Sequence, residues 1–251
     1  MMCNEIHVWG DSLARGIVYR EEQKRYAISR ERCTTRLAQS LPIKVENHSG
    51  MGATVLDGLK WFADFTGAPG ALCAIEFGGN DCDLDWAKVA ENPEHVVEAR
   101  VPLHVFEESI ARFVKEVRQR DMEAVLVTPL PLHSERYFQW VTKGLNAQAV
   151  LAALGDVHHI YRWQERYANA VRAVARALGV RMLDLRDVLL AQPDYENLIC
   201  LDGVHPNDEG HRRLSDAVMP LAQARFAAAI RLADQEASEA HLSSIPSACM
   251  M

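Results

Sequence analysis

Short apolar segments alternate along the chain with longer segments in which apolar residues recur every three or four positions. The short segments predict buried strands at Ile6–Trp9, Ile43–Glu46, Ala71–Phe77, Ala124–Thr128 and Val180–Leu185. The longer ones predict helices at Thr54–Phe65, Val105–Arg120 and Tyr161–Leu178, and a closing helix at Asn207–Leu232 that is broken near Pro220. Because strands that alternate with helices form βαβ units, the pattern predicts an α/β fold with a parallel sheet covered on both faces.

Two segments are longer than this alternation requires. Val18–Leu41 separates the first two predicted strands and is rich in charged residues, whereas Pro129–Ile160 follows the fourth strand and is aromatic and partly helical. Connections of this length usually form functional covers or flexible segments. We expect one domain over residues 1–236 with an ordered helical insertion near 129–160, and a flexible tail over 237–251.

Composition and charge exclude several classes of protein. The 251 residues are 49% hydrophobic and carry a net charge of −7, with no Lys/Arg block that would predict a nucleic-acid partner. Neither a signal peptide nor an apolar run of membrane-spanning length is present, so no membrane partner is expected. The six cysteines form no C-x-x-C pair, which favours reduced thiols and a cytoplasmic location. The oligomeric state does not follow from these features.

Glycine and polar residues follow the predicted strands where a parallel sheet forms its ligand sites. Ser12 comes after the first strand, the sequence GMGAT after the second, GGND after the third, and DGVHP before the closing helix. A serine hydroxyl becomes a nucleophile only when a base takes its proton and a third group orients that base. Asp202 and His205 are spaced so that one turn brings the carboxylate to the imidazole.

The same segments supply donors for an oxyanion. Gly52 and Ser12 can offer backbone N–H groups, and Asn80 a side-chain amide. Each residue also has a purely structural interpretation, because Asp11 and Ser12 are common helix caps and Asn80 is a common turn residue.

Together these four blocks resemble those of the SGNH (GDSL) hydrolase superfamily, and they span residues 8 to 206. The resemblance implies a three-layer α/β/α, flavodoxin-like fold with about five parallel strands. It implies Ser12 as nucleophile, His205 as base and Asp202 as its orienting carboxylate, with Ser12, Gly52 and Asn80 as the oxyanion hole. Gly52 is preferred to Gly50 because GMGAT places the family's Gly-x-Thr pattern there. Neither a metal nor a cofactor is implied, and Asp11 is expected to hold the loop that presents Ser12.

The expected function is therefore that of a serine esterase whose partner is a small-molecule ester. Small acyl esters, including acetyl esters of carbohydrates, are the expected substrates, and hydrolysis passes through an acyl-enzyme on Ser12. A lysophospholipase or an acyl thioesterase would use the same chemistry. A catalytically silent binding module on the same fold is the alternative from another class.

Two further signals point to metals and are set aside. Asp81, Asp83 and Asp85 alternate like the start of a calcium loop, but that loop's sixth position is Trp86 instead of glycine. Asp81 is expected to brace Asn80. His158 and His159 are adjacent, so they are expected to lie on the surface or in a pocket and not to share a metal.

Aromatic residues in and after the insertion could cover the site. Tyr137, Trp140, Tyr161 and Trp163 are the candidates, because the insertion leaves the sheet at a strand's carboxyl end. The alternative is that these side chains only pack the inserted helices onto the domain.

Overall fold

Five parallel strands form a sheet at the centre of the protein. The computed structural model describes residues 3–95, 98–233 and 235. The sheet order is β4-β1-β5-β6-β7, formed by β1 (Glu5–Gly10), β4 (Lys44–Asn47), β5 (Leu72–Glu76), β6 (Glu123–Val127) and β7 (Arg181–Leu183). This is the strand order of flavodoxin-like folds, so the predicted fold class is confirmed.

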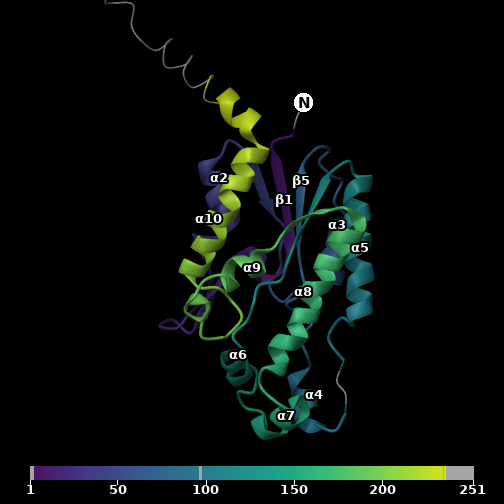
Figure 1. The fold of residues 1–251 in the computed structure, drawn as a ribbon, viewed down its shortest axis with the longest axis vertical. Helices are drawn as coiled ribbons and strands as arrows, with labels where there is room; N and C mark the ends of the chain where they lie inside the picture. The colour runs from purple at the N-terminus through teal and green to yellow at the C-terminus, as the bar shows by residue number, and fades with distance from the viewer. Residues whose placement is uncertain (1–2, 96–97, 234, 236–251) are drawn as a thin grey trace, which may run out of the picture.

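Helices cover both faces of the sheet (Figure 1). One face carries α3 (Val55–Ala63), α5 (Leu103–Gln119) and α8 (His159–Leu178); the other carries α2 (Cys33–Ser40), α9 (Leu185–Leu190) and α10 (Asp208–Arg225). The first layer is held by fully buried aromatic rings, among them Phe62, Phe113 and Tyr167. The apolar residues of each helix recur on one side, which is why the helices lie flat against the sheet.

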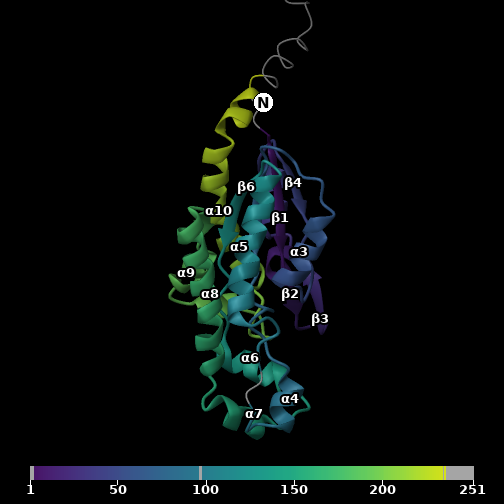
Figure 2. The same ribbon diagram turned by 90° about the vertical axis from the view of Figure 1, so that its right-hand side faces the viewer.

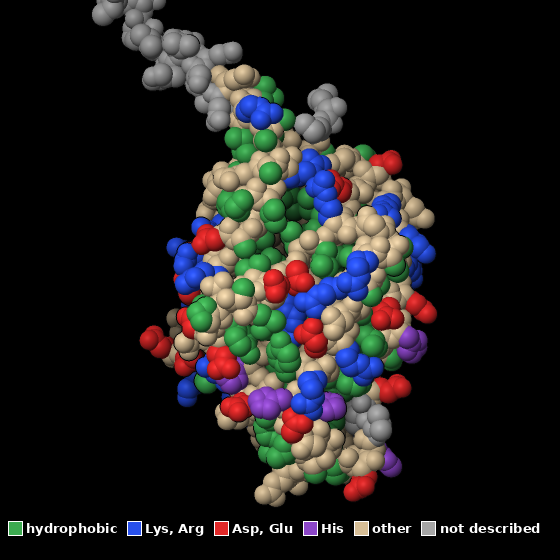
Figure 3. All heavy atoms as spheres, viewed as in Figure 1, with side chains coloured by type: hydrophobic (Ala, Val, Ile, Leu, Met, Phe, Trp, Pro, Cys, Tyr) green, Lys and Arg blue, Asp and Glu red, His purple; other side chains and the backbone are tan. Residues whose placement is uncertain are grey.

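The second layer is packed less closely. An apolar cavity of about 690 Å³ lies between the sheet and the helices α2, α9 and α10. In the view of Figure 3, with the two helix layers on either side of the sheet, a hollow with apolar side chains around it opens beside α10.

Smaller elements gather beyond the carboxyl ends of the strands. They are α1 (Ser12–Arg15), β2 (Ile17–Arg20), β3 (Arg25–Ile28), α4 (Trp86–Glu91), α6 (Ser134–Val141), α7 (Ala147–Leu154) and the 3₁₀ helix η1 (Tyr195–Leu198). Helices α4, α6 and α7 lie together at one end of the molecule, next to the first turns of α8 (Figure 2). The segment 129–160 thus contains two helices that belong to this end.

The segment Val18–Leu41 contains a hairpin that the apolar pattern did not predict. Strands β2 and β3 pair antiparallel, with Tyr19 opposite Tyr26. The turn between them has the sequence EEQK, without the Asn-Gly or Asp-Gly pair that marks most tight hairpins. Lys24 instead adopts the left-handed conformation there, with φ 48°.

The closing helix is not broken at Pro220, contrary to the prediction. Helix α10 runs through Pro220 and ends at Arg225. Pro220 lies on the exposed side of the helix, so the carbonyl of Asp216 that loses its donor can bind water. Residues 227–233 are again helical after the break at Phe226.

Three further predictions concern the cysteine thiols, the C-terminal tail and membrane-spanning segments, and the described residues cover them only in part. Cys3, Cys33, Cys73, Cys82 and Cys200 are free thiols, whereas Cys249 and the whole predicted tail over 237–251 lie outside the described residues. Within the described ranges, no helix combines the length and apolarity needed to cross a membrane.

Candidate active site

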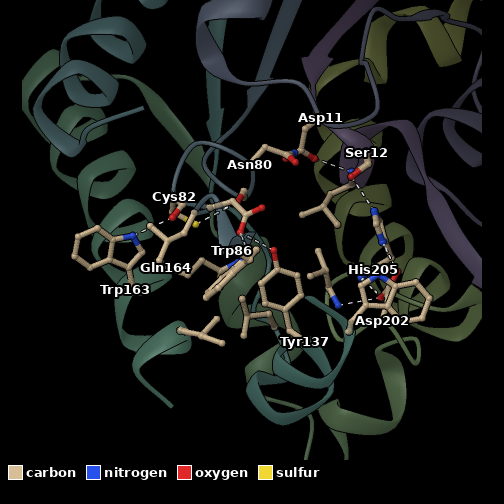
Figure 4. A pocket seen from close by; sticks show the side chains of 18 of the residues that line it. Asp11, Ser12, Asn80, Cys82, Trp86, Tyr137, Trp163, Gln164, Asp202 and His205 are labelled. Carbon is tan, nitrogen blue, oxygen red and sulfur yellow. Dashed lines mark hydrogen bonds and ion pairs between the residues drawn. The ribbon is translucent and has the colours of Figure 1, made fainter. Parts of the chain in front are cut away.

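Ser12, His205 and Asp202 lie in one hydrogen-bonded row (Figure 4). The Nε2 atom of His205 is 2.8 Å from Ser12 Oγ, and its Nδ1 atom is 2.6 Å from Asp202 Oδ2. Ser12 begins α1 directly beyond β1, and the other two precede α10. All three are buried. The structure therefore brings together the nucleophile, base and carboxylate proposed from the sequence.

Asp202 fixes the orientation of the imidazole and the position of its proton. Its Oδ1 accepts the backbone N–H groups of Val204 (3.0 Å) and His205 (3.1 Å). Burial alone would raise the pKa of Asp202, but the hydrogen bond and charge of His205 and these N–H groups outweigh it and lower the pKa. An ionised Asp202 accepts the proton on Nδ1, so the lone pair of Nε2 points at Ser12 Oγ.

The loop that carries Asp202 and His205 packs closely against the start of α6. Gly203 has φ 77°, and a Cβ atom there would lie 2.3 Å from the backbone nitrogen of Tyr137. The carbonyl of Gly203 accepts the N–H of His133, just before α6, at 2.8 Å. Only glycine fits this position, because it permits both the positive φ and the close approach of α6.

Asp11 links the Ser12 segment to the Asn80 segment. As the N-cap of α1, its Oδ1 accepts the N–H of Leu13 at 2.8 Å, and its Oδ2 accepts Asn80 Nδ2 at 2.9 Å. The expected role of Asp11 in holding this loop is thus matched by its contacts. Glu76 lies buried nearby, and burial together with the charge of Asp11 raises the pKa of Glu76 well above its usual value. A neutral Glu76 avoids a second charge beside Asp11.

Two of the three expected oxyanion donors, Ser12 and Asn80, line the pocket, and the third, Gly52, does not. Asn80 lines the pocket beside Ser12, and its amide has a second N–H besides the one given to Asp11. Ser12 is the first residue of a helix, where the backbone N–H has no intrahelical acceptor. Gly52 lies in the loop after β4 with φ 71° and does not line the pocket. Its role as a donor stays a prediction.

A pocket of about 130 Å³ opens beside Ser12 and has an aromatic wall. Three of the four proposed cover residues, Tyr137, Trp140 and Trp163, line it, and Trp86 from α4 joins them. Tyr161 does not line the pocket; its ring instead lies 4.6 Å from the guanidinium of Arg186.

Hydrogen bonds anchor this wall to the loop that carries Asn80. The half-buried Asp83 accepts Tyr137 OH at 2.6 Å and Trp86 Nε1 at 2.9 Å, and desolvation raises the pKa of Asp83 despite these donors. On the other side, Trp163 Nε1 donates to the carbonyl of Cys82 at 2.9 Å. The wall is therefore fixed in place by specific bonds.

Sequence reasoning missed the contribution of the hairpin and of Asp83. The ring of Tyr26, from β3, lies 5.3 Å from the His205 ring, and Trp140 packs edge-on against Tyr19 at 4.8 Å. Burial, with the charge of Asp202, raises the pKa of Tyr26. The β-branched and aromatic residues of IVYR and RYAI, which favour strands, were the available signal for this hairpin.

The carboxylates of the apparent calcium loop have separate partners. Asp81 accepts the N–H groups of Val55 and Gly78, both at 2.9 Å, and so braces the loop that carries Asn80. Burial raises the pKa of Asp81 to about 7. Asp83 faces the aromatic wall, and Asp85 caps α4. This arrangement gives no common cation site.

The adjacent histidines lie as expected. His158 is exposed at the start of α8, whereas His159 lines the pocket and stacks near the ring of Trp163.

A family model matches most of the chain. The model of the GDSL-like Lipase/Acylhydrolase family matches residues 8–213, a range that includes all three residues of the hydrogen-bonded row. Comparison with curated protein sequences finds no match.

Several solved structures share the fold at low sequence identity. A carbohydrate acetylesterase from Sinorhizobium meliloti is 18% identical, with a TM-score of 0.63 over 88% of this chain and 99% of that one. A catalytic mutant of an acetylxylan esterase from Geobacillus stearothermophilus is 18% identical, with a TM-score of 0.58 over 87% and 94%. A lipase/acylhydrolase from Enterococcus faecalis is also 18% identical, with a TM-score of 0.58 over 88% and 96%.

Proposed function

Because the chain belongs to the GDSL-like lipase/acylhydrolase family, whose members hydrolyse esters, we propose that it is a serine esterase acting on small acyl esters. The observation that carries this proposal is the row of hydrogen bonds from Asp202 through His205 to Ser12 Oγ. The row supplies the three groups that acyl transfer to a serine requires.

The acylation step follows from the tautomer of His205. Ser12 Oγ attacks the ester carbon while its proton passes to His205 Nε2, and the carbonyl oxygen becomes an oxyanion. The same proton then goes to the alcohol oxygen, the C–O bond breaks, and the acyl group remains on Ser12. Water loses a proton to His205 and attacks the acyl-enzyme, which releases the acid and restores Ser12. Asp202 stabilises the imidazolium that forms in both steps.

The oxyanion is assigned to the N–H of Ser12, the free amide N–H of Asn80 and the N–H of Gly52. Asp11 holds Asn80 by one amide hydrogen, which leaves the other in a fixed direction. A donor held in advance needs no reorganisation during the reaction, and for that reason it stabilises the transition state more than the ground state.

The pocket favours a short acyl group. Its volume of about 130 Å³ is below the 300–1,000 Å³ typical of drug-sized ligands, and its wall is aromatic. Aromatic side chains can stack on the apolar face of a sugar ring, and two of the structural neighbours act on acetylated carbohydrates or acetylxylan by their descriptions. We therefore extend the proposal to acetyl esters of carbohydrates, processed without a metal or cofactor at Ser12.

Active-site labelling tests the nucleophile. A fluorophosphonate probe should label the chain once, at Ser12, and Ser12→Ala should abolish both labelling and ester turnover. Thr35→Ala, on the second helix layer, serves as a matched control and should label like the wild type. Undiminished hydrolysis by Ser12→Ala would refute the proposal.

A substrate panel separates the alternatives. We expect p-nitrophenyl acetate to exceed the butyrate and octanoate in kcat/KM, and acetylated xylo-oligosaccharides to be hydrolysed. A preference for acyl-thioesters or lysophospholipids would favour the lysophospholipase or thioesterase alternatives. A folded chain that labels with no probe and cleaves no ester would be a silent binding module.

A further inference from the structure

A second cluster of chemically active side chains lies on the sheet, away from the pocket. His7 of β1 is paired in register with Glu46 of β4, and His48 follows β4 on the same side. These three residues, which we call the edge cluster, face α3 and lie at the edge strand of the sheet. The proposed esterase mechanism uses none of them.

The ligand atoms of the edge cluster converge. His7 Nδ1 and His48 Nε2 are 3.0 Å apart, and Glu46 Oε2 is 4.0 Å from the first and 3.8 Å from the second. A single point equidistant from three atoms at these separations lies about 2.1 Å from each, which matches zinc–nitrogen and zinc–oxygen bond lengths. Three protein ligands would leave one position for water.

A fourth residue prepares His7 as a ligand. Glu5 Oε2 lies 3.3 Å from His7 Nε2, so that nitrogen carries the proton and the Nδ1 lone pair is free. Such a carboxylate behind an imidazole is a regular feature of metal-binding histidines. Without a metal, His48 donates its Nε2 proton to His7 Nδ1. When an ion binds His48 Nε2, neutral His48 changes tautomer and carries its ring proton on Nδ1.

Access and charge also bear on this cluster. His7 is buried, but the side chains of Glu46 and His48 are 39% and 24% exposed, so an ion can reach them from solvent. Lys44 Nζ binds the other oxygen of Glu46 at 2.7 Å, which leaves Oε2 for a metal. The charge of Lys44 opposes a dication and limits its affinity.

We propose that His7, Glu46 and His48 form a binding site for a divalent first-row transition metal, with Zn²⁺ as the matching ion. Two imidazoles and one carboxylate are ligands that suit Zn²⁺, and they disfavour Ca²⁺ and Mg²⁺, which prefer oxygen alone. The ion would join the edge strand β4 to β1, so its effect is on stability. This inference is independent of the proposed esterase function.

Metal titration of the full chain, without any histidine tag, tests the site. After removal of metals by a chelator, Zn²⁺ should bind with one high-affinity equivalent by calorimetry and raise the melting temperature. Co²⁺ should give the visible absorption of a four-coordinate ion. Bound Co²⁺ should also quench Trp9, whose ring stacks on His48 with 4.2 Å between centroids.

Three variants at the site and one control variant distinguish this site from adventitious binding. His48→Ala and Glu46→Gln should weaken the first equivalent at least tenfold, whereas Lys44→Gln should tighten it. His158→Ala, at the exposed start of α8, should bind like the wild type. Circular dichroism and a cooperative thermal transition report that each variant is folded. Equal binding by His48→Ala, Glu46→Gln and the wild type would overturn the proposal, as would the absence of any saturable equivalent.

Discussion

At the scale of single residues, the site depends on groups that are each held by a second group. Asp11 holds Asn80, Asp202 holds His205, and Asp81 holds the loop that carries Asn80. Ser12, Asn80, Asp202 and His205 were predictable because each follows a predicted strand or precedes the last helix. Asp83 was not predicted as part of the wall, since its partners Trp86 and Tyr137 come from other segments.

Asn80 tests the assignment of the oxyanion. Asn80→Ala removes the amide that the proposed function assigns to the oxyanion, so kcat should fall by about 10²–10³ with KM little changed. Steady-state kinetics on p-nitrophenyl acetate measure both constants. A change confined to KM would mean that Asn80 binds the substrate and not the oxyanion.

Asp202 tests the orientation of the base. Asp202→Asn removes the charge that stabilises the imidazolium and lets His205 adopt the wrong tautomer, so kcat should fall by a factor on the order of 10³–10⁴. Circular dichroism should show that the variant is folded. An unchanged kcat in the folded variant would contradict the assignment of Asp202.

At the scale of elements, the site is built where several short segments meet. The five strands and the long helices were predictable because burial on both faces gives strands an uninterrupted apolar run and helices a regular apolar spacing. The hairpin β2–β3 was not, because its turn lacks glycine and burial does not alternate along its two short strands. Helix α10 passes Pro220 because the affected carbonyl faces solvent, a fact that local sequence does not contain.

Substitutions in the aromatic wall test whether α6 contributes to substrate selection. Trp140→Ala should change the ranking of esters in kcat/KM while probe labelling of Ser12 persists, because the ring lines the pocket without touching the hydrogen-bonded row. Tyr137→Phe keeps an aromatic ring in the wall and loses only the hydrogen bond to Asp83. It therefore serves as the control in which the wall is retained. If Trp140→Ala lowers the melting temperature with an unchanged ranking, the wall serves packing alone.

At the scale of the whole molecule, buried ionisable groups tie stability to pH. His211 on α10 is buried and lies 3.2 Å from the carbonyl of Ile17, which joins the closing helix to the hairpin. Burial lowers the pKa of His211 to about 4, below its usual 6.5. Between these two pKa values, His211 is protonated in the unfolded chain and neutral in the native protein.

The free energy of unfolding should therefore decrease as the pH falls from about 6.5 to about 4. The stability that neutral His211 contributes is fully present above pH 6.5 and is lost as the pH falls to about 4. The full effect of this one group is on the order of 3 kcal/mol. Urea unfolding at pH 7 and pH 5 measures the difference. His211→Gln should reduce it, and His158→Gln, an exposed control, should not. An unreduced difference in His211→Gln would assign the pH dependence to other groups.

The hydrogen bond between Ser12 and His205 joins residues 193 positions apart, and this separation has a consequence for the order of folding. Contacts between distant residues carry a high cost in loop-closure entropy until the intervening chain is structured. During synthesis from the N-terminus, the segment that contains β1 to β7 emerges before the base does. Under the proposed mechanism, Ser12 therefore stays an ordinary, unreactive hydroxyl throughout that period. Hydrolysis would then begin only when the last loop and α10 dock, and activity would be a measure of completed folding.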